Sequence, residues 1–443
     1  MRWFLARPAR LVPAAFLTTV LLGAGLLMLP IARTADHGET VMPALFTSVS
    51  AVCVTGLTTV DTATFWTPFG QTVILALIQV GGFGIMSFAT LLSLLVGNRL
   101  GLRSRIVAQA ASHTLNLGDV TRVLRRVAII MATFEAVIAV VLTVRFHLAY
   151  HDEWNVAAWH GTFHAVSSFN NAGFSLNTDS LIGYASDAWI IVPVCVAVLG
   201  GGLGFPVIAE LLHRGSRPRS WTVHTRLTIY GSLALLVIGC VAFAALEWTN
   251  DDTLGPLSFG GKLNAALAGG VMPRTVGFNV IDYGVASPET LFVTDILMFI
   301  GGGSAGTAGG IKVTTFFLLA FVIWNEIRGE DHVAIAHRSV GPSTQRQALA
   351  VALLGVAAVV AGTMSLMLIT GYGLQPTLFE SISAFATVGL STGITYDLPP
   401  AAELVLMVLM FIGRVGTVTI AAALALRSSP RRYHLPEERP IIG

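Results

Sequence analysis

A short phrase centred on a glycine recurs four times in this chain, and it constrains the fold more than any other feature. Each copy has a bulky apolar residue ten positions before the glycine, Leu or Phe directly after it, and a small or polar residue next. The copies are Ser50-Ala-Val-Cys-Val-Thr-Gly56-Leu-Thr, Ser167-Ser-Phe-Asn-Asn-Ala-Gly173-Phe-Ser, Val271-Met-Pro-Arg-Thr-Val-Gly277-Phe-Asn and Ser383-Ala-Phe-Ala-Thr-Val-Gly389-Leu-Ser. Because consecutive glycines lie a little over one hundred residues apart, we predict four diverged copies of one unit.

Apolar segments flank each glycine phrase and predict that the chain lies in a membrane. Hydrophobic residues make up 54% of the 443 residues and charged residues only 11%, whereas soluble domains carry about 25% charged residues. A helix needs about 20 mostly apolar residues to cross a bilayer. Eight spans are therefore predicted, over residues 11–31, 72–97, 127–147, 189–212, 227–247, 291–324 (interrupted), 347–371 and 404–426. The first lacks a convincing cleavage site, so it is not expected to be a removable signal.

Basic residues alternate with these spans and predict the orientation of the chain. Most of the 26 lysines and arginines lie before the first span, in every second loop, or in the tail, and the intervening loops carry mainly acids. Cytoplasmic loops are enriched in Lys and Arg, so both termini are predicted to be cytoplasmic. The alternation favours membrane topology over nucleic-acid binding, and no nucleic-acid partner is expected.

The glycine phrases have the composition expected of pore loops. Non-helical backbone at membrane depth is tolerated only inside protein or beside a water-filled path, where aligned carbonyls can replace the water shell of a cation. Glycine adopts backbone angles that cost other residues steric energy, and the carboxyl end of a half-helix adds partial negative charge. One such glycine could be a turn or a close helix contact, but four in equivalent places favour the selectivity filter of a cation pore. Thr275-Val276-Gly277 and Thr387-Val388-Gly389 match the first three residues of the potassium-channel filter loop, which favours potassium. The predicted filter residues are Val54, Thr55, Gly56, Asn171, Ala172, Gly173, Thr275, Val276, Gly277, Thr387, Val388 and Gly389.

A second glycine-rich segment interrupts the sixth apolar region. The run from Ile300 to Ile311 holds six glycines, and each glycine inside a helix costs about 0.5–1 kcal/mol relative to alanine. We therefore expect a broken helix below the filter, in the conduction path where a gate would lie, although small residues also let membrane helices pack closely. The predicted gate residues are Gly301, Gly302, Gly303, Ser304, Ala305, Gly306, Thr307, Ala308, Gly309, Gly310, Lys312 and Arg414.

Arg414 and Glu135 are charged residues that lie well inside predicted spans. Arg414 lies in the middle of the last one without an acidic neighbour, and an arginine at the bilayer centre costs about 2.5–3.5 kcal/mol and usually faces the protein interior. We expect it to face the pore and hold carbonyls of the glycine-rich run. The alternative is that it satisfies buried carbonyls away from the axis. Glu135 is expected to pair between helices and is given no transport role.

With these phrases in view, the sequence resembles the superfamily of Trk, Ktr and plant HKT potassium transporters over nearly its whole length. It is most similar to the Ktr-type membrane subunit, because eight spans are predicted without an extra amino-terminal pair. The resemblance implies four filter glycines and an intramembrane gating loop, here at residues 301–310, and Gly56, rather than serine, favours potassium. It also implies a homodimer in the bacterial plasma membrane, docked on a cytosolic ring of nucleotide-binding regulatory domains. The third phrase departs from the expected pattern, because Met272-Pro273 precedes Arg274.

The predicted fold is therefore an all-α integral membrane protein, in which four tandem helix–pore loop–helix repeats surround a central pore with pseudo-fourfold symmetry. The expected divisions are residues 1–120, 121–223, 224–340 and 341–427 for the repeats and 428–443 for a cytoplasmic tail.

The predicted function is potassium uptake through a gated, channel-like pore, as the translocating subunit of a Ktr-type system. The alternative is a sodium- or proton-coupled potassium symporter with alternating access, to which broken helices and repeats are also suited. No catalytic motif is present, so an enzyme is not expected, and no cofactor is predicted. Potassium is the expected transported ion, and sodium is a candidate activator.

Overall fold

The computed structural model describes residues 8–34, 40–97, 117–215, 218–330, 332–335 and 338–416. Part of the first basic loop, the end of the last predicted span and the tail at 428–443 lie outside these residues. The helices are α2 (Pro8–Leu27), α3 (Val41–Cys53), α4 (Thr62–Phe65), α5 (Pro68–Gly97), α7 (Leu117–Tyr150), α8 (Trp154–Phe169), α9 (Ala188–Leu203), α10 (Phe205–Arg214), α11 (Val223–Glu247), α12 (Phe259–Val271), α13 (Pro288–Phe299), α14 (Val313–Ile327), α15 (Pro342–Thr370), α16 (Leu374–Phe385) and α17 (Pro400–Phe411). Short 3₁₀ turns lie at Pro30–Ala32, Ile182–Tyr184, Pro218–Ser220 and Ile394–Asp397, and a π-helical turn at Ile412–Gly416 follows α17.

One order of elements occurs four times along the described chain. A first helix is followed by a shorter helix, an extended segment that contains the glycine, and a further helix. The shorter helices are α3, α8, α12 and α16, and each ends before its glycine. Three of the bulky residues ten positions before the glycine, Phe46, Phe163 and Phe379, are completely buried. The repeated apolar position in the sequence therefore packs the shorter helix into the core.

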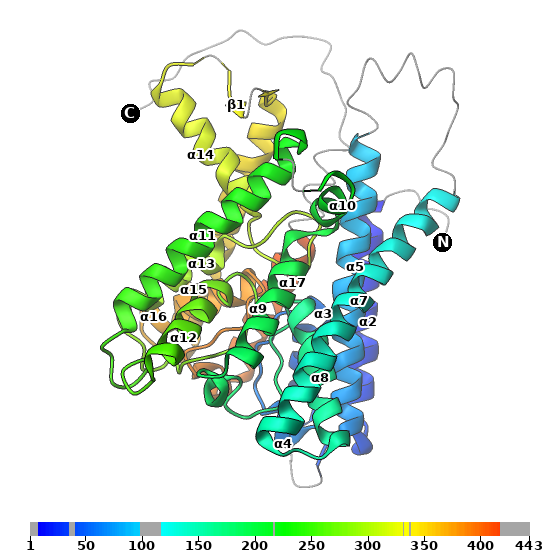
Figure 1. The fold of residues 1–443 in the computed structure, drawn as a ribbon, viewed down its shortest axis with the longest axis vertical. Helices are drawn as coiled ribbons and strands as arrows, with labels where there is room; N and C mark the ends of the chain where they lie inside the picture. Colours follow the sequence, from blue (N-terminus) through cyan, green and yellow to red (C-terminus); the bar gives the residue numbers. More distant parts are fainter. Residues whose placement is uncertain are drawn as a thin grey trace.

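Neighbouring units pack in a closed series. The helix after each glycine segment packs against the shorter helix of the next unit, as α5 does on α8, α9 on α12, and α13 on α16. The last unit returns to the first, because α17 packs against α3. Figure 1 shows the helices gathered side by side, with α4 at one end of the molecule and α10 and β1 at the other.

Within the described residues, four helices are long and apolar enough to cross a membrane, α5, α7, α11 and α15, and the bent α9–α10 pair makes a fifth if it is counted as one span. Residues 189–212 were predicted as one span, but they form α9 and α10, which meet at an angle of 97°. The bend falls at Gly204, which has φ +87° and is followed two residues later by Pro206, so a straight helix cannot continue there. The full set of eight spans and the pseudo-fourfold symmetry remain predictions.

The third unit differs from the others in its last helix. α13 ends at Phe299 and α14 begins at Val313, so the glycine-rich run lies between two helices. After α14, a two-stranded antiparallel hairpin, β1 (Ala334–Ile335) and β2 (Arg338–Ser339), leads to α15.

Candidate functional site

The four phrase glycines come from separate units and meet one another. A Cβ added to Gly173 would lie 2.5 Å from Cα of Gly277, and one added to Gly277 would lie 2.6 Å from Cα of Gly389. A Cβ on Gly389 would lie 3.0 Å from Cα of Gly56 and would also meet the carbonyl oxygen of Thr55. At Gly56 it would meet the carbonyl oxygen of Ala172. The glycines thus form a ring in chain order, with backbone carbonyls at their contacts.

The backbone of the four phrases repeats a conformation that is rare for residues with side chains. The residue two positions before each glycine has positive φ, at Val54 (56°), Asn171 (60°), Thr275 (75°) and Thr387 (49°). Such left-handed residues cost energy unless the surrounding structure enforces them. The shared conformation therefore indicates one loop design in all four units, although their sequences differ at this position.

A serine six positions before the glycine fastens three of the loops. The amide of Gly56 donates to Oγ of Ser50 and the amide of Gly389 donates to Oγ of Ser383, both at 3.0 Å. In the second unit Oγ of Ser167 donates to the carbonyl of Phe174 at 2.8 Å. The third unit has Val271 at this position and lacks such a hydroxyl.

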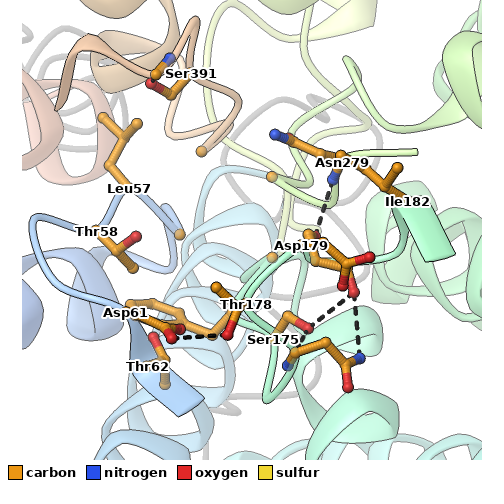
Figure 2. A pocket seen from close by; sticks show the side chains of 18 of the residues that line it. Leu57, Thr58, Asp61, Thr62, Ser175, Thr178, Asp179, Ile182, Asn279 and Ser391 are labelled. Atoms are coloured by element: carbon orange, nitrogen blue, oxygen red, sulfur yellow. Dashed lines mark hydrogen bonds between the residues drawn. The ribbon is translucent and has the colours of Figure 1, made fainter. Parts of the chain in front are cut away.

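A polar cavity of about 300 Å³ lies directly on the glycine ring. Its lining includes all four glycines and carboxylates from three units, Asp61, Asp179 and Asp282. Figure 2 shows Asp61 beside Thr178 at one edge of this cavity, where Oγ1 of Thr178 donates to the carboxylate at 2.9 Å. Carboxylates around a concave site raise the local concentration of cations.

Glycines in the helical segments that follow three of the phrases allow close contact with the phrase of the same unit. A Cβ added to Gly81, Gly201 or Gly413 would collide with a carbonyl oxygen four residues before the phrase glycine of its own unit. Those carbonyls belong to Val52, Phe169 and Phe385 respectively. Because these three glycines have no side chains, the filter phrases pack directly against the backbone of the segments that follow them.

The glycine-rich run between α13 and α14 lies beside three of the phrases. Oγ1 of Thr307 donates to Oδ1 of Asn171 at 2.8 Å, and a Cβ on Gly309 would collide with the side chain of Thr387. A Cβ on Gly301 would lie 3.4 Å from Cγ2 of Thr275. The segment therefore closes against the predicted filter residues of the second, third and fourth units.

The run is fixed by backbone hydrogen bonds to the bent α9–α10 pair. The amide of Gly303 donates to the carbonyl of Gly202 at 2.8 Å, and the amide of Thr307 donates to that of Gly201 at 3.1 Å. The amide of Phe205, at the start of α10, donates to Ala305 at 3.3 Å. Among the predicted gate residues, Ser304 Oγ lies 3.0 Å from Oγ1 of Thr314.

Two basic side chains also hold the run. Arg414, in the π-helical turn after α17, donates through Nη1 to the carbonyl of Thr307, and Nζ of Lys312 donates to that of Ala308. Arg414 is only 2% exposed. Its Nε and Nη2 have no hydrogen-bond partner among the described residues. The structure therefore brings Arg414 to the glycine-rich run, as the sequence predicted.

The remaining predicted gate residues, Gly302, Gly306, Ala308 and Gly310, belong to the same run. Gly306 lies where a Cβ would be 2.9 Å from the carbonyl oxygens of Gly201 and Gly202. Only a residue without a side chain fits between these backbones.

Two buried polar networks that the sequence analysis did not assign to the site lie behind the phrases. Glu380 in α16 is completely buried, and its carboxylate accepts from Oγ of Ser391 at 2.6 Å and from Oγ1 of Thr395 at 2.7 Å. In the second unit the equivalent residue, His164, places Nε2 3.0 Å from Oγ of Ser175. Both lie nine positions before the phrase glycine and reach the residue two positions after it. The shared position of an ionisable residue, nine residues before the phrase glycine, was the available signal.

Glu135 forms a further buried network and pairs between helices, as expected. Its carboxylate accepts from Nε2 of Gln79 and from Nδ2 of Asn170, both at 3.0 Å. Nδ2 of Asn170 also donates to Oε1 of Gln79 at 2.8 Å. Since Asn170 immediately precedes the left-handed residue of its phrase, the network ties this loop to α5 and α7.

Comparison with known proteins places the chain in a family. The family model described as TrkH, a cation transport protein, matches residues 16–432. The chain belongs to this family. The resemblance on which the sequence analysis relied is thus confirmed, and the family is one of membrane cation transporters, not of enzymes.

Curated relatives match over nearly their full lengths. The chain is 37% identical over 425 residues to the Ktr system potassium uptake protein B of Bacillus subtilis, covering 96% of this chain and 94% of the relative. It is 34% identical to the potassium/sodium uptake protein NtpJ of Enterococcus hirae, covering 98% and 97%. The crystal structure of the potassium transporter TrkH from Vibrio parahaemolyticus superposes with a TM-score of 0.71 at 20% identity, covering 94% of this chain and 85% of that one. That match supports the same helical membrane-transporter fold.

Proposed function

We propose that the chain takes up potassium through a gated, channel-like pore across the bacterial plasma membrane, as the translocating subunit of a Ktr-type system. The contact of four glycines from four units, at the floor of an acidic cavity, carries the proposal. Carbonyls collected around such a ring can take the place of the water that a potassium ion loses. The relatives named for potassium uptake support the choice of ion.

The glycine-rich run supports the gated part of the proposal. It touches the phrases of three units and is held by hydrogen bonds to α9, α10 and Arg414. Releasing it would require a few hydrogen bonds to break, while the packed helices around it stay in place. In this proposal the run blocks the path from the filter when closed, and its displacement opens that path.

The proposal includes partners that the family resemblance implies. Two copies of the chain form a homodimer, which docks on a cytosolic ring of nucleotide-binding regulatory domains, and both termini face the cytoplasm. Sodium is proposed as an activator, in keeping with the potassium/sodium uptake protein among the relatives.

Ion flux into liposomes tests the proposal directly. The purified chain is reconstituted in sodium-free buffer at fixed pH, and the reversal potential of its current is measured in a series of potassium gradients. We expect reversal at the potassium equilibrium potential, unchanged by added sodium or by a pH gradient. A reversal potential that moves with sodium or with pH would instead establish coupled symport, and the absence of potassium flux both without and with added sodium would overturn both readings.

A further inference from the structure

The third phrase lacks the serine that fastens the other three loops. Ser50, Ser167 and Ser383 each form a hydrogen bond within their own loop, whereas Val271 stands at the equivalent position. The loop also differs in its backbone, because Gly277 is the one phrase glycine without positive φ. Something else must hold this loop against the ring.

Arg274 supplies a different attachment. Its Nη1 donates to the carbonyl of Ser232 at 2.7 Å, and its Nη2 donates to Oγ of the same residue at 2.9 Å. The guanidinium thus grips one residue of α11 with two donors, a geometry that lysine cannot reproduce. Arg274 lies three positions before the ring glycine Gly277, so this grip fixes the loop close to the predicted filter.

The energetic cost of burying the charge of Arg274 indicates that this residue does more than fill space. Arg274 is 5% exposed, and no ion pair to it is found within the described part of the chain. Its Nε also has no hydrogen-bond partner among those residues. An unpaired buried cation destabilises a protein, and a positive charge near a cation path repels the transported ion. An apolar residue could fill the same space without either energetic cost.

The same face of α11 also contacts the glycine-rich run. Thr228 lies one helical turn before Ser232, so the two side chains point to the same side of α11. A Cβ added to Gly303 would lie 2.7 Å from Cγ2 of Thr228. One helix face therefore contacts both the third filter loop and the run proposed to gate the pore.

From these contacts we infer that Arg274 is a positioning residue. It fastens the third loop to Ser232 of α11 in place of the missing serine, and so maintains the ion selectivity of the ring. This inference rests on the proposed function, because selectivity has meaning only if the ring conducts. It predicts that weakening the grip lowers selectivity more than it lowers total uptake.

Transport by four variants tests the inference. Arg274→Met removes both donors, Arg274→Lys keeps the charge without the paired donors, and Ser232→Ala removes one acceptor. Arg219→Met, at an exposed arginine, is the matched control. Potassium and sodium uptake are measured side by side in cells without other uptake systems, per amount of protein in the membrane.

We expect the ratio of potassium to sodium uptake to fall about tenfold in Arg274→Met, given the usual strength of hydrogen bonds to charged groups. Arg274→Lys and Ser232→Ala should show smaller falls, and Arg219→Met none. If Arg274→Met does not reach the membrane, the other two variants decide. An unchanged ratio in both Arg274→Lys and Ser232→Ala would overturn the inference.

Thermal unfolding in detergent separates this inference from the proposed function. If the two residues act as one attachment, Ser232→Ala should lower the melting temperature of the unsubstituted chain but have little further effect on Arg274→Met, because coupled sites are not additive. Independent, additive effects would overturn the attachment. This measurement needs no transport. If the effects of the two substitutions on the melting temperature are coupled but the chain moves no potassium, only the proposed function fails.

Discussion

At the scale of single residues, the glycine ring can form only because its members have no Cβ atom. Gly56, Gly173 and Gly389 combine positive φ with a neighbouring loop on the side where a Cβ would stand. Any other residue would be strained in its own backbone and would push the adjacent carbonyls away from their places. Glycine is therefore required for steric reasons at several positions of the ring.

Gly389→Ser is expected to weaken ion selectivity. The new Cβ would meet the carbonyl oxygen of Thr55 at a residue with φ +99°, and strain of this kind costs about 1–3 kcal/mol. If the strain falls on the filter, the preference for potassium over sodium should drop by roughly tenfold, since 1.4 kcal/mol corresponds to a factor of ten. Parallel uptake of the two ions measures it.

Gly25→Ser is the control for this experiment, because a Cβ at Gly25 of α2 meets nothing within 4 Å. It should leave the preference unchanged. Equal preference in Gly389→Ser and the unsubstituted chain, at equal amounts in the membrane, would remove Gly389 from the filter.

Glu135→Ala is expected to destabilise the second loop. The change leaves the amides of Gln79 and Asn170 without their shared acceptor, and an unsatisfied buried polar group costs about 1–3 kcal/mol. Glu135→Gln retains one acceptor oxygen and should lose less. Thermal unfolding in detergent provides the measurement, and equal melting temperatures for Glu135→Ala and the unsubstituted chain would show that the network carries no stability.

At the scale of elements, two breaks in helices shape the site. The bend at Gly204 turns α10 away from α9, which leaves the carbonyls of Gly201 and Gly202 open to accept from the glycine-rich run. The interruption between α13 and α14 supplies that run. Amide and carbonyl groups left without helical partners at one break form hydrogen bonds with those at the other. Irregular backbone at membrane depth requires such internal hydrogen bonds.

Arg414→Ala is expected to raise potassium flux. The substitution removes the hydrogen bond from Nη1 to the carbonyl of Thr307, and with it one attachment that holds the run closed. Hydrogen bonds to charged groups contribute about 1.5–3 kcal/mol, and 1.4 kcal/mol corresponds to a factor of ten, so flux should rise by about tenfold or more. Potassium flux into liposomes is the measurement, with Arg346→Ala at an exposed site of α15 as the control. Unchanged flux with intact folding would remove Arg414 from the gate.

At the scale of the whole molecule, the closed packing series places the four units around one ring. α17 meets α3, so residues more than three hundred positions apart become neighbours. The cytoplasmic regulatory partner is proposed to act on this assembly from outside it. The basic tail at residues 428–443 is a candidate contact, although it lies outside the described residues.

Deletion of residues 430–443 is expected to weaken docking of the regulatory ring. The tail carries basic residues and an acidic pair, which suit an exposed polar interface rather than a buried one. Co-purification with a candidate cytosolic nucleotide-binding partner measures the docking, and uptake with that partner present measures its effect. Undiminished co-purification would place the docking surface elsewhere, while uptake by the truncated chain alone checks that its pore is intact.

The sequence by itself determined the membrane setting, the four phrases, the helix interruption over 301–310 and the family. These features follow from composition and local backbone chemistry, which act over a few residues and repeat along the chain. Arg414 was also predicted at the run, because an intramembrane charge leaves few places for it to bond.

Only the tertiary structure decided which distant residues meet. The bend at Gly204, the grip of Arg274 on Ser232 and the Glu135 network each join segments whose separate sequences carry no sign of the partner. A buried polar group in the sequence indicates that it must form a hydrogen bond, but the packing of whole helices determines which atom is its partner. For the same reason the sequence showed that the third phrase was different, and the structure showed the contact of Arg274 with Ser232 that we propose holds it.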